Sequence, residues 1–302
     1  MSDKAHKATD KLLNDLEKEL KTIYQNAYNK AKKELDKTLS KLGDLSKIEN
    51  PTQRLALINK RNRLQSLIKL LSKEIQNSNK IAMSLMQENL LNVYGENHNY
   101  AAYLVENLSG YEVGYTFYNK AAIKRILAGE ESPFLQIALD DIKDRNTIIK
   151  ELRRQLTEAV LLGESPYKIA QRIKKVTEKN MNNSMRIART ETTRVENAAR
   201  EDAFKQGEKL GLNLKKKWIS TLDSRTRSSH QHLMGEEIGL DDVFSNGLRF
   251  PGDYLGSAKE VVNCRCTMVT EFVDFEKTPE EKKLDERLKK MTYEEWSKER
   301  DV

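Results

Sequence analysis

Residues 12–39 read LLNDLEKELKTIYQNAYNKAKKELDKTL, and apolar residues recur in this stretch every three or four positions. That spacing follows the 3.6-residue period of an α-helix and gathers the apolar side chains on one face. We therefore expect a long amphipathic helix over residues 9–42. Its apolar stripe consists of Leu13, Leu16, Leu20, Ile23, Ala27, Ala31, Leu35 and Leu39.

A second apolar stripe of the same period predicts another long helix over residues 52–94. Gly43 and Asn50-Pro51 separate the two stretches, because proline cannot continue a helix and disfavours helical geometry in the residue before it. Neither helix could bury its stripe alone, so residues 1–94 are predicted to form a helical hairpin. The second stripe consists of Leu57, Leu64, Leu67, Leu71, Ile75, Ala82 and Leu85.

Residues 95–160 are expected to form a tyrosine-rich connector followed by helices. Six tyrosines gather between positions 94 and 118, where they suit a packed turn region or, as the alternative, a surface on which nucleic-acid bases stack. Two Ser-Pro pairs then predict helix starts, because serine caps a helix and proline suits its first position. The predicted helices lie near 133–162, 166–179 and 182–209.

The last third of the chain changes to shorter elements. Residues 214–220 and 266–273 suit strands, and residues 226–233 suit a short helix. The predicted fold class is therefore α+β, in which a long N-terminal helical hairpin precedes a small α+β domain over residues 161–273. An acidic tail over residues 274–302 is expected to contain a short amphipathic helix, with apolar side chains from Leu284, Leu288, Met291, Tyr293 and Trp296.

Charge and composition exclude several classes of protein. The chain has 53 Lys and Arg against 46 Asp and Glu, and residues 1–80 alone hold 18 against 10. No apolar run approaches the roughly 20 residues that span a bilayer, so we expect no membrane association. The first residues lack the apolar block of a signal peptide, and two cysteines one residue apart favour a reducing compartment.

Three polar blocks stand out in the C-terminal half. They read RIARTETTRVENAAREDAF (186–204), KKWISTLDSRTRSSHQHLMGE (216–236) and FPGDYLGSAKEVVNCRC (250–266). Threonines are poor helix formers, so the T-E-T-T turn needs support from elsewhere in the fold. Arg189 and Glu191 are the side chains that we expect to bind the next block.

His230, Cys264 and Cys266 form a candidate metal site, because imidazole and thiolate are zinc ligands. The C-x-C spacing differs from the usual zinc knuckle, and buried cysteines are often plain core residues, so no bound metal is the primary expectation and zinc the alternative. His232 would point away from His230 on a helix. A metal- or thiol-dependent hydrolase using His230 and the cysteines is a further alternative. The phosphate-binding, nucleophile-elbow and zinc-protease motifs are absent, so we expect no enzyme activity.

Residues 51–80 present a basic stripe with a single acidic residue, Glu74. Such a stripe neutralises phosphates without reading base sequence, although it equally suits a solvated helix. The candidate DNA-binding residues are Arg54, Lys60, Arg61, Arg63, Lys69 and Lys73.

The order R-T-E-T, W-x₄-D-x-R-T-R-x-x-H and N-C-R-C closely resembles the phage Mu F-like minor head protein family, also called head morphogenesis proteins. The resemblance covers about residues 160–272. The family often has a proline just before N-C-R-C, whereas this chain has Val261-Val262. This departure affects only the expected geometry of the local turn. The resemblance implies a structural virion protein in the capsid interior that is made in the host cytoplasm. Its implied partner is the portal protein, with the scaffold, the major capsid protein and double-stranded DNA as further candidates, and its implied roles are procapsid assembly and DNA packaging or ejection.

No catalytic role comes with the resemblance. We expect the matching residues to form a buried polar network that ties the long helix to the small sheet. These residues are Arg189, Thr190, Glu191, Trp218, Asp223, Arg225, Arg227, His230, Asn263, Cys264, Arg265 and Cys266.

Overall fold

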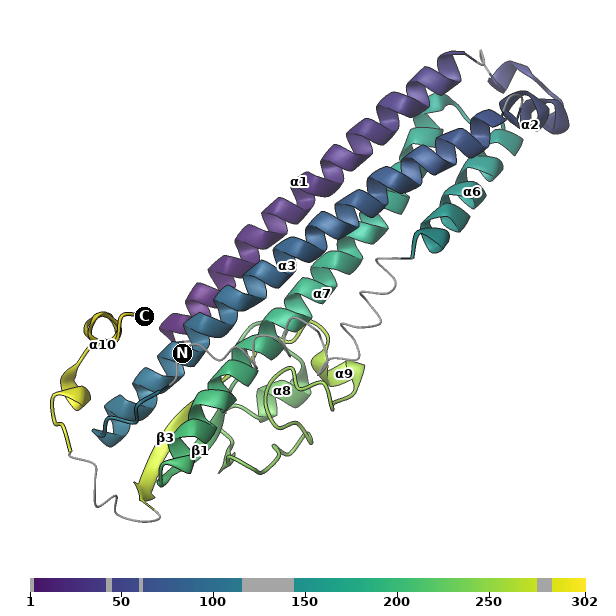
Figure 1. The fold of residues 1–302 in the computed structure, drawn as a ribbon. Coiled ribbons are helices and arrows are strands. Elements are labelled where there is room, and N and C mark those ends of the chain that lie inside the picture. The colour runs from purple at the N-terminus through teal and green to yellow at the C-terminus, as the bar shows by residue number, and fades with distance from the viewer. Residues whose placement is uncertain (1–2, 42–44, 60–61, 116–143, 276–283) are drawn as a thin grey trace. The chain divides into compact units, whose positions relative to one another are not determined.

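The computed structural model shows a chain that is mostly helical, with one small sheet in its C-terminal part (Figure 1). The α+β fold class is therefore confirmed. The described residues are 3–41, 45–59, 62–115, 144–275 and 284–302.

The first two predicted helices are present, and their boundaries differ from the prediction. Helix α1 spans Lys4–Ser40, a 3-10 turn η1 spans Leu45–Lys47, and α2 spans Pro51–Asn59. Helix α3 then runs over Arg63–Ser109. The predicted second helix is thus two helices, separated near Asn62, whose φ of 56° is left-handed and ends regular helical geometry.

Helix α3 continues well past the predicted end at residue 94. Ala101, Ala102 and Val105 are buried and extend its apolar face, so no break occurs at Gly95. The expectation of a packed turn region is therefore wrong for residues 94–109, which are helical. Residues 116–143, which include the start of the helix predicted from 133, lie outside the described residues.

Two further helices follow. Helix α6 spans Arg145–Leu161, and the side chain of Asp144 caps it by accepting a hydrogen bond from the Asn146 backbone N–H. Helix α7 spans Pro166–Lys209 as one element of 44 residues, where the sequence predicted two. No glycine or proline interrupts residues 167–206, so nothing in the backbone forces a break near position 180.

The sheet has three antiparallel strands in the order β2-β1-β3. Strand β1 spans Leu212–Ile219, β2 spans Glu237–Gly239 and β3 spans Thr267–Phe275. Two short helices lie between the strands, α8 over Ser228–His232 and α9 over Ala258–Val261. Both predicted strands and the predicted short helix are present with shifted ends.

The chain divides into two compact units. Unit 1 consists of Met1–Asp15, Gln87–Leu135 and Arg186–Val302, and unit 2 consists of Leu16–Met86 and Gln136–Met185. Helices α1, α3 and α7 each contribute residues to both units.

Unit 2 is a helical bundle with its own apolar core. Parts of α1, α2, α3, α6 and α7 supply this core. Most residues of the two predicted stripes are buried, while Leu13, Ile23, Leu57 and Leu85 are half-buried. Polar groups inside the bundle are paired: the Tyr24 hydroxyl donates to Asn79 Oδ1 at 2.7 Å and lies 2.7 Å from Ser184 Oγ. Fully buried core members include Leu35, Leu71, Leu152 and Ile173.

Unit 1 contains the sheet and a second core around Phe204, Leu214 and Met268. The C-terminal residues pack on this unit through a 3-10 turn η3 over Leu288–Lys290 and helix α10 over Tyr293–Glu299. A short helix is therefore present in the tail, but it carries only Tyr293 and Trp296 of the five predicted apolar side chains. Leu288 lies in η3, Leu284 is exposed outside any helix, and Thr278-Pro279 lies outside the described residues. No helix among the described residues has the length and apolar character needed to cross a bilayer.

Candidate functional site: a thiol and imidazole cluster beside a buried polar network

The T-E-T-T turn of α7 is held by the backbone of the N-C-R-C segment. The Thr193 hydroxyl donates to the Cys264 carbonyl oxygen, and the Asn263 backbone N–H donates to Thr190 Oγ1 at 3.1 Å. Asn197 Nδ2 donates to the Cys266 carbonyl oxygen at 3.2 Å. The prediction that contacts from elsewhere in the fold hold this turn is therefore confirmed. Two of these hydrogen bonds involve the threonine hydroxyls. Because threonine side chains are short, the backbone of α7 and that of the N-C-R-C segment can approach closely.

Another close contact with α7 involves the loop before α9. Gly252 has a φ of +85°, and a Cβ built on it would lie 3.0 Å from the Arg194 backbone nitrogen. A side chain here would be strained by the backbone angle and by the helix in front of it. Beside it, the buried Arg194 Nε donates to Glu191 Oε2 at 2.7 Å within α7.

Asp223 and Arg265 join the second and third sequence blocks. Arg265 Nη1 and Nη2 each donate to one Asp223 carboxylate oxygen at 2.6 Å, which is the bidentate geometry that arginine favours. The Arg225 backbone N–H donates to Asp223 Oδ1 at 2.9 Å, while the Arg225 side chain is exposed. The guanidinium of Arg227 donates to the Val262 carbonyl oxygen just before the N-C-R-C segment.

The thiol and imidazole cluster consists of His230, Cys264 and Cys266. His230 Nδ1 lies 3.5 Å from Cys264 Sγ and 3.5 Å from Cys266 Sγ. All three side chains are at most 2% exposed. On the other edge of the ring, His230 Nε2 lies 2.9 Å from Glu260 Oε2 of α9.

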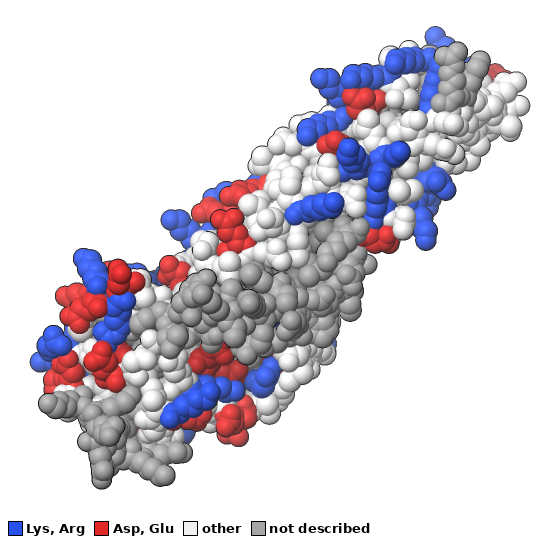
Figure 2. Space-filling model, viewed as in Figure 1, with Lys and Arg blue, Asp and Glu red and all other residues white. Residues whose placement is uncertain are grey.

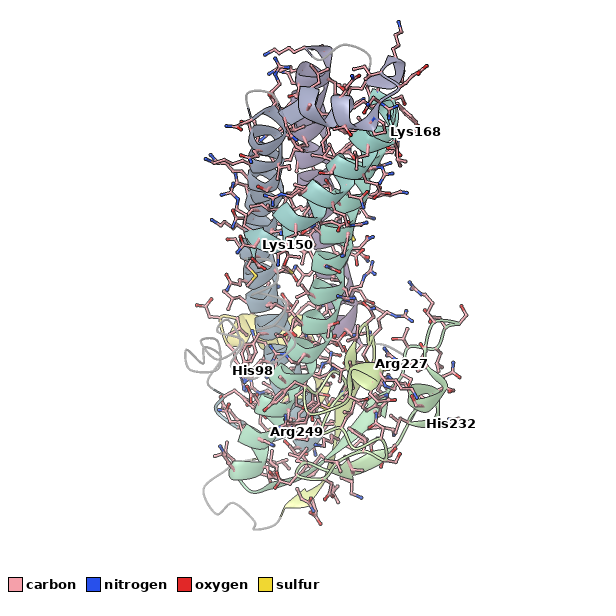
Figure 3. The ribbon with its side chains drawn as sticks, turned by 90° about the vertical axis from the view of Figure 1, so that its right-hand side faces the viewer. His98, Lys150, Lys168, Arg227, His232 and Arg249 are labelled. Carbon is pink, nitrogen blue, oxygen red and sulfur yellow. The ribbon has the colours of Figure 1, made fainter. Side chains whose placement is uncertain are left out.

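Neighbouring groups fix the orientation of this cluster. The Trp218 ring meets the His230 ring edge-on at a centroid distance of 5.3 Å, and Ser220 Oγ donates to the His230 carbonyl oxygen. His232, two residues along α8, is exposed on the outer side of the domain (Figure 3). The predicted divergence of the two histidines is confirmed.

The two thiols are not equivalent. The hydrogen bond from Cys264 and the adjacent His230 lower the pKa of Cys266 below its ordinary value, against the effect of burial. The same bond to Cys266, together with burial, raises the pKa of Cys264. The pair therefore carries a single negative charge more readily than two.

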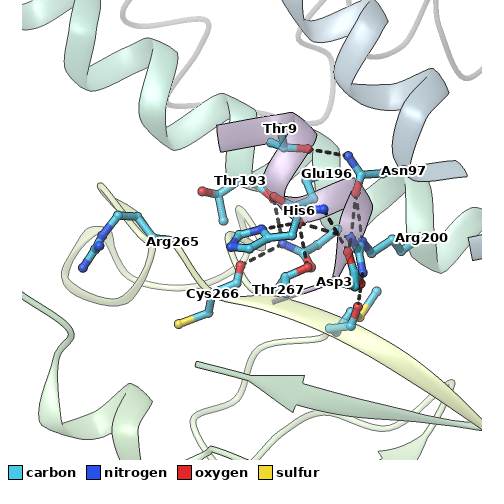
Figure 4. A network of polar contacts seen from close by, with 12 residues as sticks. Asp3, His6, Thr9, Asn97, Thr193, Glu196, Arg200, Arg265, Cys266 and Thr267 are labelled. Carbon is cyan, nitrogen blue, oxygen red and sulfur yellow. Dashed lines mark hydrogen bonds and ion pairs between the residues drawn. The ribbon is translucent and has the colours of Figure 1, made fainter. Parts of the chain in front are cut away.

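A second polar network, centred on Arg200 of α7, was not predicted from the sequence (Figure 4). Arg200 Nη2 donates to Asp3 Oδ1 at 2.8 Å and to Asn97 Oδ1 at 2.9 Å, and Nη1 donates to the Met268 carbonyl oxygen at 2.9 Å. Arg200 is 1% exposed. The helical spacing of Glu196 and Arg200 was visible in the sequence, but nothing in the sequence indicated that this face is buried.

Glu196 connects this network to His6 of α1. His6 Nδ1 lies 2.7 Å from Glu196 Oε1, and the Thr267 hydroxyl donates to the same oxygen at 2.7 Å. Burial lowers the pKa of His6, but the carboxylate of Glu196 outweighs it and raises that pKa to about 9. His6 is therefore expected to be protonated at neutral pH and to form an ion pair with Glu196.

The candidate DNA-binding residues lie in different environments. Arg54 is half-buried, and its guanidinium donates to the carbonyl oxygens of Ile48, Glu49 and Leu161, so it holds the bundle together and is not free to bind phosphate. The remaining candidates divide by exposure: Lys69 and Lys73 are exposed, Arg63 is half-buried, and Lys60 and Arg61 lie outside the described residues.

Residues 150–269 match the protein-family model described as Phage Mu protein F like protein. Residues 150–269 therefore form a Phage Mu F-like segment. The matched segment contains α7, strands β1 and β2, the first three residues of β3, and the thiol and imidazole cluster. The resemblance drawn from R-T-E-T, the W-to-H block and N-C-R-C is thereby confirmed.

Two curated proteins are similar to this chain over longer stretches. The minor head protein GP7 of Bacillus phage SPP1 is 25% identical over 268 residues, which cover 87% of the chain and 84% of GP7. The NAD(+)–arginine ADP-ribosyltransferase EFV of Enterococcus faecalis is 36% identical over 160 residues, which cover 51% of the chain and 32% of that enzyme. The first similarity extends over nearly the whole length of both proteins, whereas the second is confined to a part of each.

Within unit 1, the structure brings most of the motif residues into one region. Thr190 meets Asn263, Asp223 meets Arg265, and the cysteines meet His230. The side chain of Arg225 is largely exposed and reaches only the rim of this region, where its Nη2 lies 3.6 Å from Asp223 Oδ2. The motif residues thus serve chiefly to join α7, α8 and the start of β3.

Proposed function

We propose that this protein is a minor head protein of a tailed phage that lies inside the capsid, associates with the portal and assists procapsid assembly and DNA packaging or ejection. The observation that carries the proposal is the similarity to SPP1 GP7 over 87% of the chain and 84% of GP7. If the two proteins shared only one domain, the helical N-terminal region of this chain would lie outside the alignment. The family match over residues 150–269 supports the same assignment.

We further propose that the protein is not an enzyme. The match to the ADP-ribosyltransferase covers only 32% of that enzyme, so its activity does not extend to this chain by similarity. The alternative of a thiol hydrolase needs a sulfur that a substrate carbonyl can approach. Cys264 and Cys266 are 1% and 2% exposed, which supports a structural role for these thiols.

Contact with the portal would involve the polar outer surface of unit 2. The apolar stripes of its helices are already buried against one another, so they are not available as docking faces. In Figure 2, Lys and Arg side chains gather over the region where Figure 1 places the end of α1 together with α2 and α6. Lys32, Lys33 and Lys37 are exposed side chains near the C-terminal end of α1.

The test is co-purification of the full-length chain with the portal protein of its own phage. Removing residues 1–94 would delete α1 and most of α3 and expose the core of the bundle, so that truncation cannot separate binding from folding. We expect Lys32→Glu, Lys33→Glu and Lys37→Glu together to reduce co-purification. The same reversal at Lys289, Lys290 and Lys298 of unit 1 is the matched control. No co-purification of the unmodified chain with portal or procapsids would contradict the proposal.

A second candidate function, non-specific binding of double-stranded DNA, is favoured by the distribution of charge. The residues of unit 2 include 25 Lys and Arg against 14 Asp and Glu, a formal charge of +11. Those of unit 1 include 28 against 32, a formal charge of −4. The whole positive excess therefore belongs to unit 2, where phosphate contacts would release counterions.

Binding of duplex DNA should weaken steeply as salt increases, with a slope of roughly 0.9 for each phosphate neutralised. Reversing Lys69, Lys73 and Lys80, which are exposed on α3, should lower both the affinity and that slope. The unit 1 reversal at Lys289, Lys290 and Lys298 again serves as the control. Unchanged DNA affinity after the α3 reversal would exclude this face of α3 as the DNA-binding surface. That result would not bear on portal binding.

A further inference from the structure

The atoms of the thiol and imidazole cluster are spaced as the corners of a tetrahedral metal site. Zinc binds sulfur at about 2.3 Å and histidine nitrogen at about 2.0 Å, so two such ligands on one tetrahedral ion are roughly 3.5 Å apart. His230 Nδ1 lies 3.5 Å from each cysteine sulfur. All three atoms lie within 4.8 Å of one another. One ion could therefore contact all three with little movement of the side chains.

The orientation of the imidazole also suits a ligand. Glu260 Oε2 lies 2.9 Å from His230 Nε2, and a carboxylate accepts the proton on that nitrogen. The lone pair of Nδ1 is then directed at the two sulfurs. Histidines that bind metals usually have such an acceptor on the opposite nitrogen, because it fixes the tautomer and the ring orientation.

The C-x-C spacing is explained by the backbone before β3. Asn263 has a φ of 57°, and the Cys266 backbone N–H donates to Cys264 Sγ at 3.5 Å. The segment therefore turns so that both sulfurs face the same point. An N–H bond to sulfur also suits a thiolate, since it stabilises the negative charge.

We propose that His230, Cys264 and Cys266 bind one Zn²⁺ ion, with Glu260 as the acceptor that orients the histidine. Each thiol that is still protonated loses its proton to solvent on binding, and no oxidation or reduction takes place. The described residues contain no fourth His, Cys, Asp or Glu in the cluster, so a water molecule would complete the tetrahedron. The ion would link α8 to the segment that enters β3, and the burial of its three protein ligands would keep large substrates away from it.

The burial of the ligands determines how such an ion would exchange. Because His230 and both cysteines are nearly inaccessible, zinc would enter as the domain folds and would leave only when it opens. We expect the full-length protein, purified without chelator and with its thiols reduced, to contain one zinc per chain by elemental analysis. Chelator should remove it slowly in buffer and rapidly in denaturant.

Cobalt provides a measurement that needs no variant. Co²⁺ added to the reduced, metal-free chain should give the visible absorption of a tetrahedral ion and a thiolate-to-cobalt band in the near ultraviolet. Zn²⁺ should then abolish both signals. A reduced, folded protein that binds neither ion stoichiometrically overturns the proposal and leaves two buried thiols hydrogen-bonded to a histidine.

Variants locate the site. Cys264→Ser with Cys266→Ser, and separately His230→Asn, should lose stoichiometric zinc, whereas His232→Asn, an exposed histidine on the same helix, should keep it. Glu260→Ala should weaken zinc affinity roughly 10- to 100-fold, as loss of an orienting carboxylate does elsewhere. Zinc retained at full stoichiometry without both cysteines would also overturn the proposal, since the metal would then lie elsewhere.

Discussion

Arg200 Nη2 donates to Asp3 Oδ1 at 2.8 Å, so residues 197 positions apart form one buried ion pair. Asp3 lies just before α1, and Arg200 lies on the part of α7 that faces β3. The pair fixes the start of α1 in unit 1. Hydrogen bonds from Arg200 to Asn97 and Met268 satisfy its remaining donors, as a buried guanidinium requires.

Replacing Arg200 with methionine should destabilise unit 1 strongly. The substitution removes the guanidinium from Asn97 Oδ1 and from Asp3, which keeps the His6 backbone N–H as a donor. Breaking a buried ion pair in this way typically costs about 3–5 kcal/mol. Chemical denaturation of the full-length protein measures the loss. Arg225→Met, at an exposed arginine of the same unit, should change stability by no more than about 0.5 kcal/mol. Equal effects of the two substitutions would show that the Arg200 network contributes little.

Stability should fall between about pH 6.5 and pH 9 because of His6. Its pKa is raised to about 9 in the folded protein from an ordinary value of 6.5, since the carboxylates of Glu196 and Asp10 outweigh burial and the nearby Arg200. The protonated ring therefore stabilises the fold fully below pH 6.5, and that contribution is lost as pH rises through 9. It amounts to roughly 3.5 kcal/mol, because the rise of the pKa from 6.5 to about 9 is about 2.5 pH units at about 1.4 kcal/mol per unit.

The measurement is the free energy of unfolding against pH for the unmodified protein and for His6→Gln. Glutamine keeps a hydrogen-bond donor near Glu196 but does not titrate, so the decline between pH 6.5 and 9 should be largely absent in the variant. Parallel pH profiles for the two proteins would show that His6 is not the group responsible.

Gly252→Ala should cost more stability than Gly247→Ala. Both glycines have positive φ, +85° and +80°, so each substitution strains the backbone by about 1 kcal/mol. Only at Gly252 would the added Cβ meet another segment, 3.0 Å from the Arg194 backbone nitrogen, whereas nothing lies within 4 Å at Gly247. Thermal denaturation of the two variants therefore isolates the contact with α7. Equal thermal unfolding midpoints for the two variants would mean that the loop at Gly252 moves away from α7 at little cost in stability.

Truncating Trp296 should loosen the C-terminal residues and unit 1 together. The ring is 1% exposed, and its Nε1 donates at 2.7 Å to Glu106 Oε2, which Arg300 also contacts at 2.7 Å. Trp296→Ala should cost about 3–5 kcal/mol, chiefly through lost packing, and it also removes one of the two donors to Glu106 Oε2. Lys298→Ala on the same helix is the control. Limited proteolysis should cleave the tail of the tryptophan variant faster, and an unchanged rate would contradict the contact.

The sequence predicted the helical elements of unit 2 more reliably than their ends. Apolar periodicity identified the stripes of α1 and α3, because a buried helical face must repeat every 3.6 residues. The same periodicity does not show where a helix stops in the absence of glycine or proline. Helix α3 therefore continues past residue 94 and α7 past residue 180.

The three polar blocks predicted the family and the candidate site, but not the roles of individual side chains. Thr190 and Thr193 support the N-C-R-C segment, whereas Arg189 and Glu191 were the expected contacts. Hydroxyls of this kind carry no distinctive pattern in a sequence. The position of a threonine relative to a distant carbonyl is set only when the helix and the turn pack together.

By itself, the amino-acid sequence determined the α+β class, the long amphipathic helices, the excess of basic residues toward the N-terminus and the motifs that resemble the Phage Mu F-like family. These properties depend on residue types at short spacing, which local physics converts directly into helices, strands and charge. Only the tertiary structure decided that His230, Cys264 and Cys266 meet and that Asp3 reaches Arg200. Such contacts join residues far apart in the chain. They stabilise the fold only after burial has removed the water that would otherwise compete for the same polar groups.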